Sequence, residues 1–394
     1  MNIQFWCIFC FFLLTKYTSV AQQSNIIVGA ELIEAYSNAI KGKSIAIVAN
    51  QTSTIGNVHL VDSLYKLGYD IKTIFAPEHG FRGSADAGEH IKNGIDNKTG
   101  IPITSLYGKN KKPTKAQLKD IEIVLFDIQD VGVRFYTYIS TLHYMMEACA
   151  ENKIKLIVLD SPNPNGYYID GPVLDSGFQS FVGMHKVPIV HGLTIAEYAK
   201  MVNGEGWLNK KLVCNLMVVP CKNYTHNSRY SLPIPPSPNL RSDAAIQLYP
   251  SLGLFEGTVI SVGRGTETPF EMIGYPNCSY CTYEFTPKSG YGSKYPKHEN
   301  TLCKGFKLSE FGLNEIPKQK SLYLNWIIGL YKDAEDKEGF FSNQKFFDLL
   351  AGGSTLREQI QDNYSEFQIK NSWNEEIELF KKTRKLYLLY DDFE

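Results

Sequence analysis

Strand-length apolar runs alternate with helix-like patterns over residues 44–203, and this alternation constrains the fold more than any other feature of the chain. Residues 44–49, 71–75, 123–126 and 156–159 are the expected strands. Residues 58–67, 138–150 and 195–202 carry apolar side chains at helical spacing, the last of them behind Thr194 as a helix cap. Because parallel strands joined by crossover helices produce this order, the pattern predicts an α/β fold with a sheet covered on both faces.

A proline-rich passage, residues 232–239, ends this pattern, because proline can continue neither a helix nor a central strand. Chain length also favours two domains, since roughly 370 residues remain after an N-terminal leader and exceed what one core usually supports. We place the boundary near Ala245. Residues 22–245 would form the first domain, and residues 246–394, with mixed strands up to about Phe306 followed by helices, would form a smaller α+β domain.

The N-terminus has the pattern of a secretory signal. Residues 3–14 are almost entirely apolar, and Ser19-Val20-Ala21 supplies the small residues of a cleavage site. Residues 1–21 are therefore expected to be a signal peptide, with a retained anchor as the alternative because no basic residue precedes the run. The mature protein would be periplasmic or extracellular. No later run reaches the about 20 apolar residues of a membrane span, so no stable membrane insertion is expected.

The charge balance argues against nucleic acid as a partner. Lysine and arginine number 40 and aspartate and glutamate 41, whereas phosphate binding needs a basic face. Cys278 and Cys281 form a lone C-x-x-C, with no second pair at zinc-site spacing. The sequence allows disulfides in an oxidising compartment but does not predict their pairing.

Polar residues follow each of the four expected strands. In open α/β sheets, ligands bind outside the carboxyl ends of the strands, so these residues should meet at one edge. Glu78 and His79 are the least easily explained as turn residues, and the glycines at 80 and 83 would let a ligand approach the backbone closely. The full set is Asn50 and Gln51, Glu78 and His79, Asp127 and Asp130, and Asp160.

Several chemistries lack their usual motifs. No G-x-G-x-x-G turn, G-x-S-x-G elbow, H-E-x-x-H helix or Walker loop occurs, so dinucleotide, acyl-serine and zincin chemistry lose support. A metal site could be assembled from His79, Asp86, Glu89 and His90, but their spacing matches no metal motif. Neither a metal nor another cofactor is expected.

Carboxylate acid/base chemistry remains. Cleavage of a glycosidic bond needs two carboxyl groups, one that donates a proton and one that assists the nucleophile or water. Glu78 could be the acid, with Asp127, Asp130 or Asp160 as its partner and His79 orienting it or the substrate. Further polar groups in glycine-flanked or proline-rich loops are expected at the same site: Arg82, Arg134, Tyr136, His191, Asn239, Glu256, Arg264 and Glu271.

These motifs together resemble the exo-β-N-acetylmuramidase family of peptidoglycan hydrolases. The resemblance is carried by Ala76-Pro77-Glu78-His79-Gly80 within residues 75–83, and by residues 49–53, 127–134, 159–164, 236–240 and 256–271. It covers nearly the whole mature chain. Ser161 departs from the pattern, where a basic residue is expected before the proline, and this puts one binding contact in doubt.

The resemblance implies an enzyme that removes N-acetylmuramic acid from the non-reducing ends of peptidoglycan fragments. It also implies a Rossmann-like domain, a smaller C-terminal domain and a cleft between them. The glutamate of the family's proline-glutamate-histidine-glycine motif, proposed there as catalytic, corresponds to Glu78. Muramic acid carries a carboxylate, for which arginine's planar fork is suited, so Arg82, Arg134 and Arg264 are candidates to bind it.

Two other functions stay open at this point. A metal-dependent hydrolase or deacetylase of cell-wall sugars could use His79 and His90. A non-catalytic muropeptide-binding protein could use the same acids to accept hydrogen bonds from sugar hydroxyls.

Overall fold

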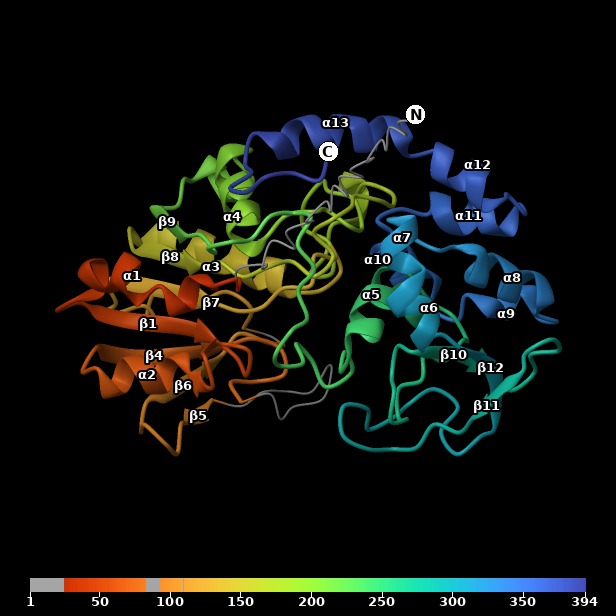
Figure 1. Ribbon diagram of the computed structural model, residues 1–394, viewed down its shortest axis with the longest axis horizontal. Coiled ribbons are helices and arrows are strands. Elements are labelled where there is room, and N and C mark those ends of the chain that lie inside the picture. The colour runs from red at the N-terminus through yellow and green to blue at the C-terminus, as the bar shows by residue number, and fades with distance from the viewer. Residues whose placement is uncertain (1–24, 83–92, 109) are drawn as a thin grey trace, which may run out of the picture.

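The computed structural model describes residues 25–82, 93–108 and 110–394. Its first half is a seven-stranded sheet in the order β5-β6-β4-β1-β7-β8-β9, seen at the left of Figure 1. All neighbours pair in parallel except the edge strand β5. The strands are β1 (Ser44–Ala49), β4 (Asp70–Ala76), β5 (Gly94–Ile95), β6 (Pro102–Ser105), β7 (Ile123–Asp127), β8 (Lys155–Leu159) and β9 (Leu216–Val219).

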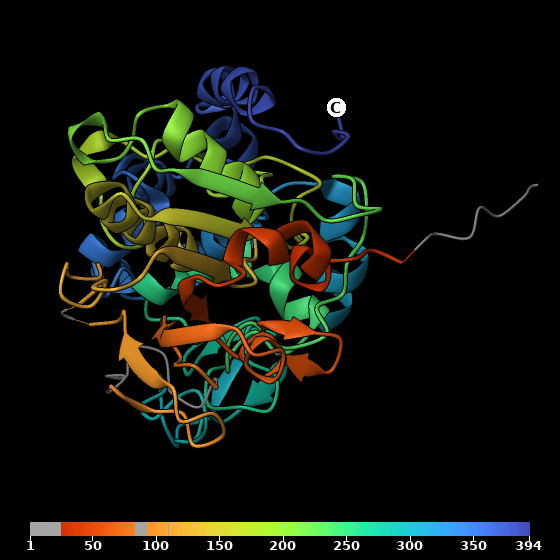
Figure 2. The same cartoon turned by 90° about the vertical axis from the view of Figure 1, so that its left-hand side faces the viewer.

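Apolar side chains bury both faces of this sheet. On one face, alternate strand residues pack against α1 (Ile33–Ile40) and α2 (Leu60–Lys66). On the other, the remaining strand residues pack against α3 (Tyr138–Asn152) and α4 (Ile195–Gly204). In Figure 2 the strands form a twisted layer in front of the second half of the chain. The predicted α/β fold with a parallel sheet covered on both faces is confirmed.

The four predicted strands and most helix positions are also confirmed. The Thr194 hydroxyl accepts a hydrogen bond from the Glu197 amide at the start of α4, as a cap should. The helix expected over residues 58–67 begins later, because β3 (Val58–His59) pairs with β2 (Thr54–Ile55) in a small hairpin. Strands β5, β6 and β9 were not predicted. They are short and lie at or next to the two edges of the sheet.

The second half contains a small antiparallel sheet and a group of helices, as predicted for an α+β unit. The sheet has the order β10-β12-β11, and α5 with the short helix η4 leads into it. The expected boundary near Ala245 falls inside α5 and stays a prediction. The elements are α5 (Asp243–Leu252), η4 (Gly253–Gly257), β10 (Met272–Tyr275), β11 (Tyr283–Phe285), β12 (Cys303–Lys307), α6 (Ser309–Asn314), α7 (Ile316–Gln319), α8 (Asn325–Asp333), α9 (Lys337–Phe340), α10 (Gln344–Ala351), α11 (Thr355–Gln361), α12 (Glu366–Asn371) and α13 (Asn374–Lys385).

The end of the chain returns to the first half. Helix α13 runs along the top of Figure 1 from the second half back over the first. The fully buried Arg384 donates to the Gly192 carbonyl at 2.8 Å, and the Leu389 amide donates to Glu197 at 2.8 Å. The last residues therefore help to fasten the two halves together.

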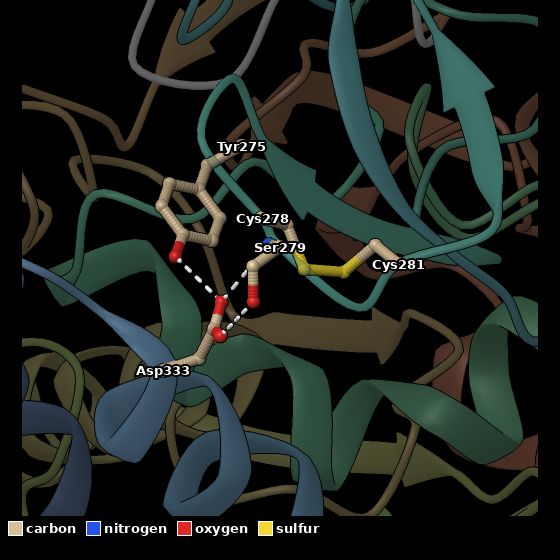
Figure 3. Close-up of a disulfide and its surroundings, with 5 residues drawn as sticks. All are labelled: Tyr275, Cys278, Ser279, Cys281 and Asp333. Carbon is tan, nitrogen blue, oxygen red and sulfur yellow. Dashed lines mark hydrogen bonds between the residues drawn. A yellow bond between two sulfur atoms is a disulfide. The ribbon is translucent and has the colours of Figure 1, made fainter.

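A disulfide joins Cys278 and Cys281 in the turn after β10. Figure 3 shows Asp333, at the end of α8, accepting hydrogen bonds from the Tyr275 hydroxyl and from the amide and hydroxyl of Ser279. The cross-link and Asp333 fix this turn against α8. Among the described residues, no helix is long and apolar enough to cross a membrane.

Candidate active site

A cavity of about 290 Å³ lies where the carboxyl edge of the large sheet faces the second half. The β1 arrow in Figure 1 points towards this second half. Strands β4 and β7 leave β1 on opposite sides, which makes this edge the topological switch point where α/β proteins bind ligands. Both halves line the cavity, the first with Glu78, His79, Tyr107, Tyr136 and Thr137, the second with Glu256, Arg264, Phe270 and Phe346.

Glu78 stands on a tight turn directly after β4. The Gly80 amide donates to the Pro77 carbonyl at 3.1 Å, which closes a turn with Glu78 and His79 at its two central positions. His79 has a φ of 69°, a conformation that a non-glycine residue adopts at some cost and that occurs preferentially at functional sites. The turn ends the strand abruptly and leaves Glu78 half-buried in the cavity wall.

Two hydroxyl groups contact the Glu78 carboxyl. Thr137 occupies the N-cap position of α3, but its hydroxyl makes no capping hydrogen bond and donates instead to Glu78 Oε2 at 2.9 Å. The partial positive charge of the helix N-terminus therefore lies beside this carboxyl. Tyr107 is also hydrogen-bonded to Glu78, and burial together with the Glu78 charge raises the pKa of Tyr107. The tyrosine thus stays protonated as a donor.

An arginine–glutamate pair occupies the opposite wall. Arg264 Nε donates to Glu256 Oε1 at 2.8 Å, Nη2 donates to the same oxygen, and the guanidinium lies 5.1 Å from the Phe270 ring centroid. Burial lowers and the Glu256 carboxylate raises the pKa of Arg264, with a net rise. Behind the pair, Lys297 donates to the carbonyls of Phe255 and Glu256 at 3.0 and 3.1 Å. The pair is held in place while a quarter of each side chain is exposed (26% and 24%).

The proline-rich segment forms the third wall. Its Pro236 carbonyl accepts hydrogen bonds from Tyr136 at 2.9 Å, Tyr138 at 3.2 Å and Gln51 at 3.1 Å. This fixes the position of Asn239, whose amide donates to the Gly292 carbonyl at 2.6 Å. Its Oδ1 has no hydrogen-bond partner among the described residues. A buried acceptor in a cavity wall is suited to a ligand N–H or hydroxyl.

The structure does not bring the three expected partner aspartates to this cavity. Asp160 accepts hydrogen bonds from Thr194 at 2.8 Å, from the Ala196 amide at 3.0 Å and from Tyr390 at 2.5 Å, all in the interior. Asp130 accepts from the Gly132 amide at 2.7 Å and is 4% exposed. Asp127 lines a separate cavity of about 40 Å³. The second carboxylate in the Glu78 cavity is Glu256.

Burial dominates the electrostatics of these three aspartates. It raises the pKa of Asp127 to about 8, and those of Asp130 and Asp160 to about 7. The Oδ2 of Asp127 and the Oδ1 of Asp130 have no hydrogen-bond partner among the described residues. These groups therefore favour the neutral form that burial selects.

Two of the three candidate arginines form ion pairs or hydrogen bonds away from the cavity. Arg82 forms ion pairs with Asp96 at 3.0 Å and Asp62 at 3.2 Å beside α2. Arg134 is fully buried and donates to the carbonyls of Val187 at 2.7 Å and Leu350 at 3.0 Å. Neither lines the cavity, and Arg264 does. Sequence shows which loops reach the sheet edge but not where a long side chain points.

Four other predicted binding residues, Asn50, Gln51, His191 and Glu271, do not line the cavity. Asn50 is fully buried and donates to Tyr138 at 2.9 Å. Glu271 accepts from Ser242 at 2.5 Å, at the cap of α5. His191 is fully buried, and burial together with the nearby Arg384 and Arg134 lowers its pKa to about 3. Gln51 contacts the proline-rich segment, and its binding role, like those of the other site residues, stays a prediction.

Tyr107 and Thr137 line the cavity but were not predicted from the sequence. Tyr107 follows β6, a four-residue edge strand that begins with Pro102 and gave no clear strand pattern. Thr137 lies between Tyr136, which was predicted, and the helix expected over residues 138–150, and no motif marks it. Lys297, which holds the Glu256 backbone without lining the cavity, sits in the irregular region before β12, where neither periodicity nor a motif marks it.

Metal binding gains no support from the described part of the chain. It contains no group of three or more histidine, cysteine, aspartate or glutamate side chains placed to hold an ion. Asp86, Glu89, His90 and Gly83 lie outside the described residues.

Comparison with known proteins agrees with this geometry. The family model described as exo-β-N-acetylmuramidase NamZ, N-terminal, matches residues 45–244, and the C-terminal model of the same family matches residues 247–390. The chain belongs to the NamZ exo-β-N-acetylmuramidase family. The family resemblance and the prediction of a glycoside hydrolase are thereby confirmed.

Relatives extend over almost the full chain. A Bacillus subtilis (strain 168) protein named peptidoglycan β-N-acetylmuramidase NamZ is 40% identical over 380 residues, covering 91% of this chain and 90% of that protein. A crystal structure of a DUF1343 family protein from Bacteroides fragilis NCTC 9343 is 47% identical, with a TM-score of 0.87, over 94% of this chain and all of that one. A second such protein from the same organism is 29% identical, with a TM-score of 0.78, over 93% and 99% of the two chains.

Asp127 generates a prediction about stability and pH. An unfolded aspartate titrates near pH ~3.9, whereas burial raises the folded pKa to about 8. Between these values the folded state holds a proton that the unfolded state has released, so the free energy of unfolding falls as pH rises. One such proton gives a slope of about 1.4 kcal/mol per pH unit. Asp127→Asn should flatten the fall measured by urea unfolding between pH 5 and pH 7.

The exposed Asp120 supplies the matched control. Asp120→Asn should reproduce the parent's pH dependence. An Asp127→Asn variant whose free energy of unfolding falls as steeply as the parent's would contradict the assignment.

Proposed function

We propose that this enzyme releases N-acetylmuramic acid from the non-reducing ends of peptidoglycan fragments, with Glu78 as the general acid. The observation that carries the proposal is the Glu78 carboxyl, placed in a cavity wall after β4 and contacted by Thr137 and Tyr107. The name of the Bacillus subtilis relative supports the substrate. A cavity of about 290 Å³ lies at the small end of ligand sites, which suits a single terminal sugar.

Glu256 is the second carboxylate of the proposed mechanism. Both hydrogen bonds from Arg264 go to Oε1, and Oε2 accepts none among the described residues. Glu78 would protonate the glycosidic oxygen as its bond to the sugar breaks, and Glu256 would stabilise the positive charge that develops on the ring or assist the incoming water. Arg264 holds Glu256 in position for this task.

Arg264 is also the proposed contact for the muramic carboxylate. Its Nη1 donates no hydrogen bond among the described residues, whereas Nε and Nη2 hold Glu256. A guanidinium is always charged and its planar fork fits a carboxylate. One side chain could therefore join the substrate's acid to the enzyme's second carboxylate.

Glu78→Gln tests the general acid. Positioned general acids contribute about 10²- to 10⁴-fold, so kcat on a chromogenic N-acetylmuraminide should fall at least about 100-fold. The matched control is Glu122→Gln, a surface residue paired with Lys43, which should retain full activity. Near-normal release of N-acetylmuramic acid by a folded Glu78→Gln enzyme would exclude the assignment.

Arg264→Ala tests carboxylate recognition. A hydrogen bond to a charged group contributes about 1.5–3 kcal/mol, so the preference for a chromogenic N-acetylmuraminide over the matching N-acetylglucosaminide, measured as a ratio of kcat/KM values, should fall about 10- to 100-fold. Arg229→Ala, at an exposed position, is the control. If Arg264→Ala slows both substrates equally, Arg264 acts through Glu256 alone.

We further propose that the enzyme is exported to the periplasm or the extracellular space. Residues 1–21, the expected signal peptide, lie outside the described residues. The Cys278–Cys281 disulfide supports the proposal because such bonds persist mainly in oxidising compartments. Mass spectrometry of the protein purified from its native host should find an N-terminus at Gln22, and an intact leader would contradict cleavage.

A further inference from the structure

A second cavity lies beside the active site and shares a wall with it. It measures about 470 Å³ and is lined by Lys111, Tyr144 and Trp207 among others. Phe181 lines both cavities. We propose that this outer cavity binds the part of the glycan that lies beyond the scissile bond, that is, the sugars that remain after the terminal muramic acid is removed. The inference rests on the proposed function and adds a leaving-group site to it.

The position of Glu78 gives the direction of the glycan. A general acid must lie at the glycosidic oxygen, so the leaving part of the substrate begins beside Glu78. Tyr107 is hydrogen-bonded to Glu78, and the centroid of its ring lies 6.5 Å from that of Phe181. Tyr144, which lines the outer cavity, is stacked with Phe181 at an interplanar angle of 17° and a centroid distance of 6.3 Å. A line of three rings thus leads from the acid to the outer cavity.

The outer cavity has the side chains that a sugar chain requires. Tyr144 and Trp207 are half-buried, and aromatic rings present flat apolar faces on which sugar rings can pack. Trp207 is itself held by stacking on His185, with centroids 4.6 Å apart and planes at 12°. His185 is fixed in turn by hydrogen bonds of 2.9 Å with Tyr198 and His143. The platform is therefore rigid before any ligand binds.

Its charges fit a glycan that carries carboxylates. Lys111 lines the outer cavity, and its Nζ lies 4.2 Å from the centroid of Phe181, the ring that lines both cavities. The acidic residue in the wall, Glu147, is neutralised by Lys112 at 2.5 Å and accepts from the Asn209 amide at 3.0 Å. In peptidoglycan every second sugar is a muramic acid, so the leaving chain brings another carboxylate, which Lys111 would meet.

Substrate length provides the test. The length ratio is kcat/KM for a muramic acid-ended tetrasaccharide divided by kcat/KM for a chromogenic N-acetylmuraminide. It should fall about fivefold in Lys111→Met and about tenfold in Tyr144→Ala. The fall should come mainly from a higher KM for the tetrasaccharide. Lys115→Ala, an exposed lysine four residues away, should leave the ratio unchanged. Thermal unfolding checks that each variant is folded.

A binding measurement separates this inference from the proposed function. Calorimetry on the Glu78→Gln enzyme with an N-acetylglucosamine-ended trisaccharide, which has no terminal muramic acid, should show binding that Lys111→Met weakens about fivefold. If the parent enzyme cleaves neither substrate, the proposed function fails. The trisaccharide binding measurement still shows whether the outer cavity binds a sugar chain. Equal affinity of the trisaccharide for Glu78→Gln with and without Lys111→Met, or an unchanged length ratio, would overturn the inference.

Discussion

One backbone carbonyl, that of Pro236, joins the edge of the sheet to the segment that leads into the second half. Pro236 accepts hydrogen bonds from Gln51, Tyr136 and Tyr138, all of which belong to the carboxyl edge of the sheet. Proline cannot donate from its own nitrogen, so a proline-rich segment must be fixed through its carbonyls, and here the sheet edge supplies the donors. Asn239 and the start of α5 follow within a few residues, so this contact also helps to position the second half. The cavity thus depends on a contact that no catalytic group makes.

The acidic residues at this edge separate into two kinds according to their access to the cavity. Asp127, Asp130 and Asp160 end or follow central strands, and their carboxyl groups turn into the interior, where burial raises their pKa values. Glu78 follows β4 and projects from a turn into the cavity. The longer Glu78 side chain, on a turn that contains the left-handed His79, reaches the cavity, whereas the shorter aspartate side chains remain in the core. Burial therefore separates structural acids from the candidate catalytic one.

Periodicity sufficed to predict the four central strands and the helices α3 and α4, because burial on both faces of a parallel sheet leaves a strong apolar pattern. It also gave the edge at which Glu78, Asn239 and Arg264 gather. It could not separate Arg264 from Arg134, since both follow glycine-containing loops and only packing shows that Arg134 points to the carbonyls of Val187 and Leu350. It missed Tyr107 because β6 is short and begins with Pro102. It missed Glu256 as a second acid because Glu78 and Glu256 come together from the two halves of the chain, and such long-range proximity leaves no local signal in the sequence.

Under the proposed function, the two halves of the chain have different tasks. The sheet half supplies the acid and fixes it with Thr137 at a helix N-terminus, so its geometry is set by rigid secondary structure. The second half supplies Glu256 from η4 and Arg264 from the loop before β10. Lys297 fastens η4 through its backbone carbonyls. A sugar without the muramic carboxylate would leave Arg264 Nη1 without a partner in a partly buried wall, at a cost in binding. Selectivity for muramic acid would therefore arise in the half that does not carry the proton donor, and the contacts at Pro236 help to hold the two halves around one sugar.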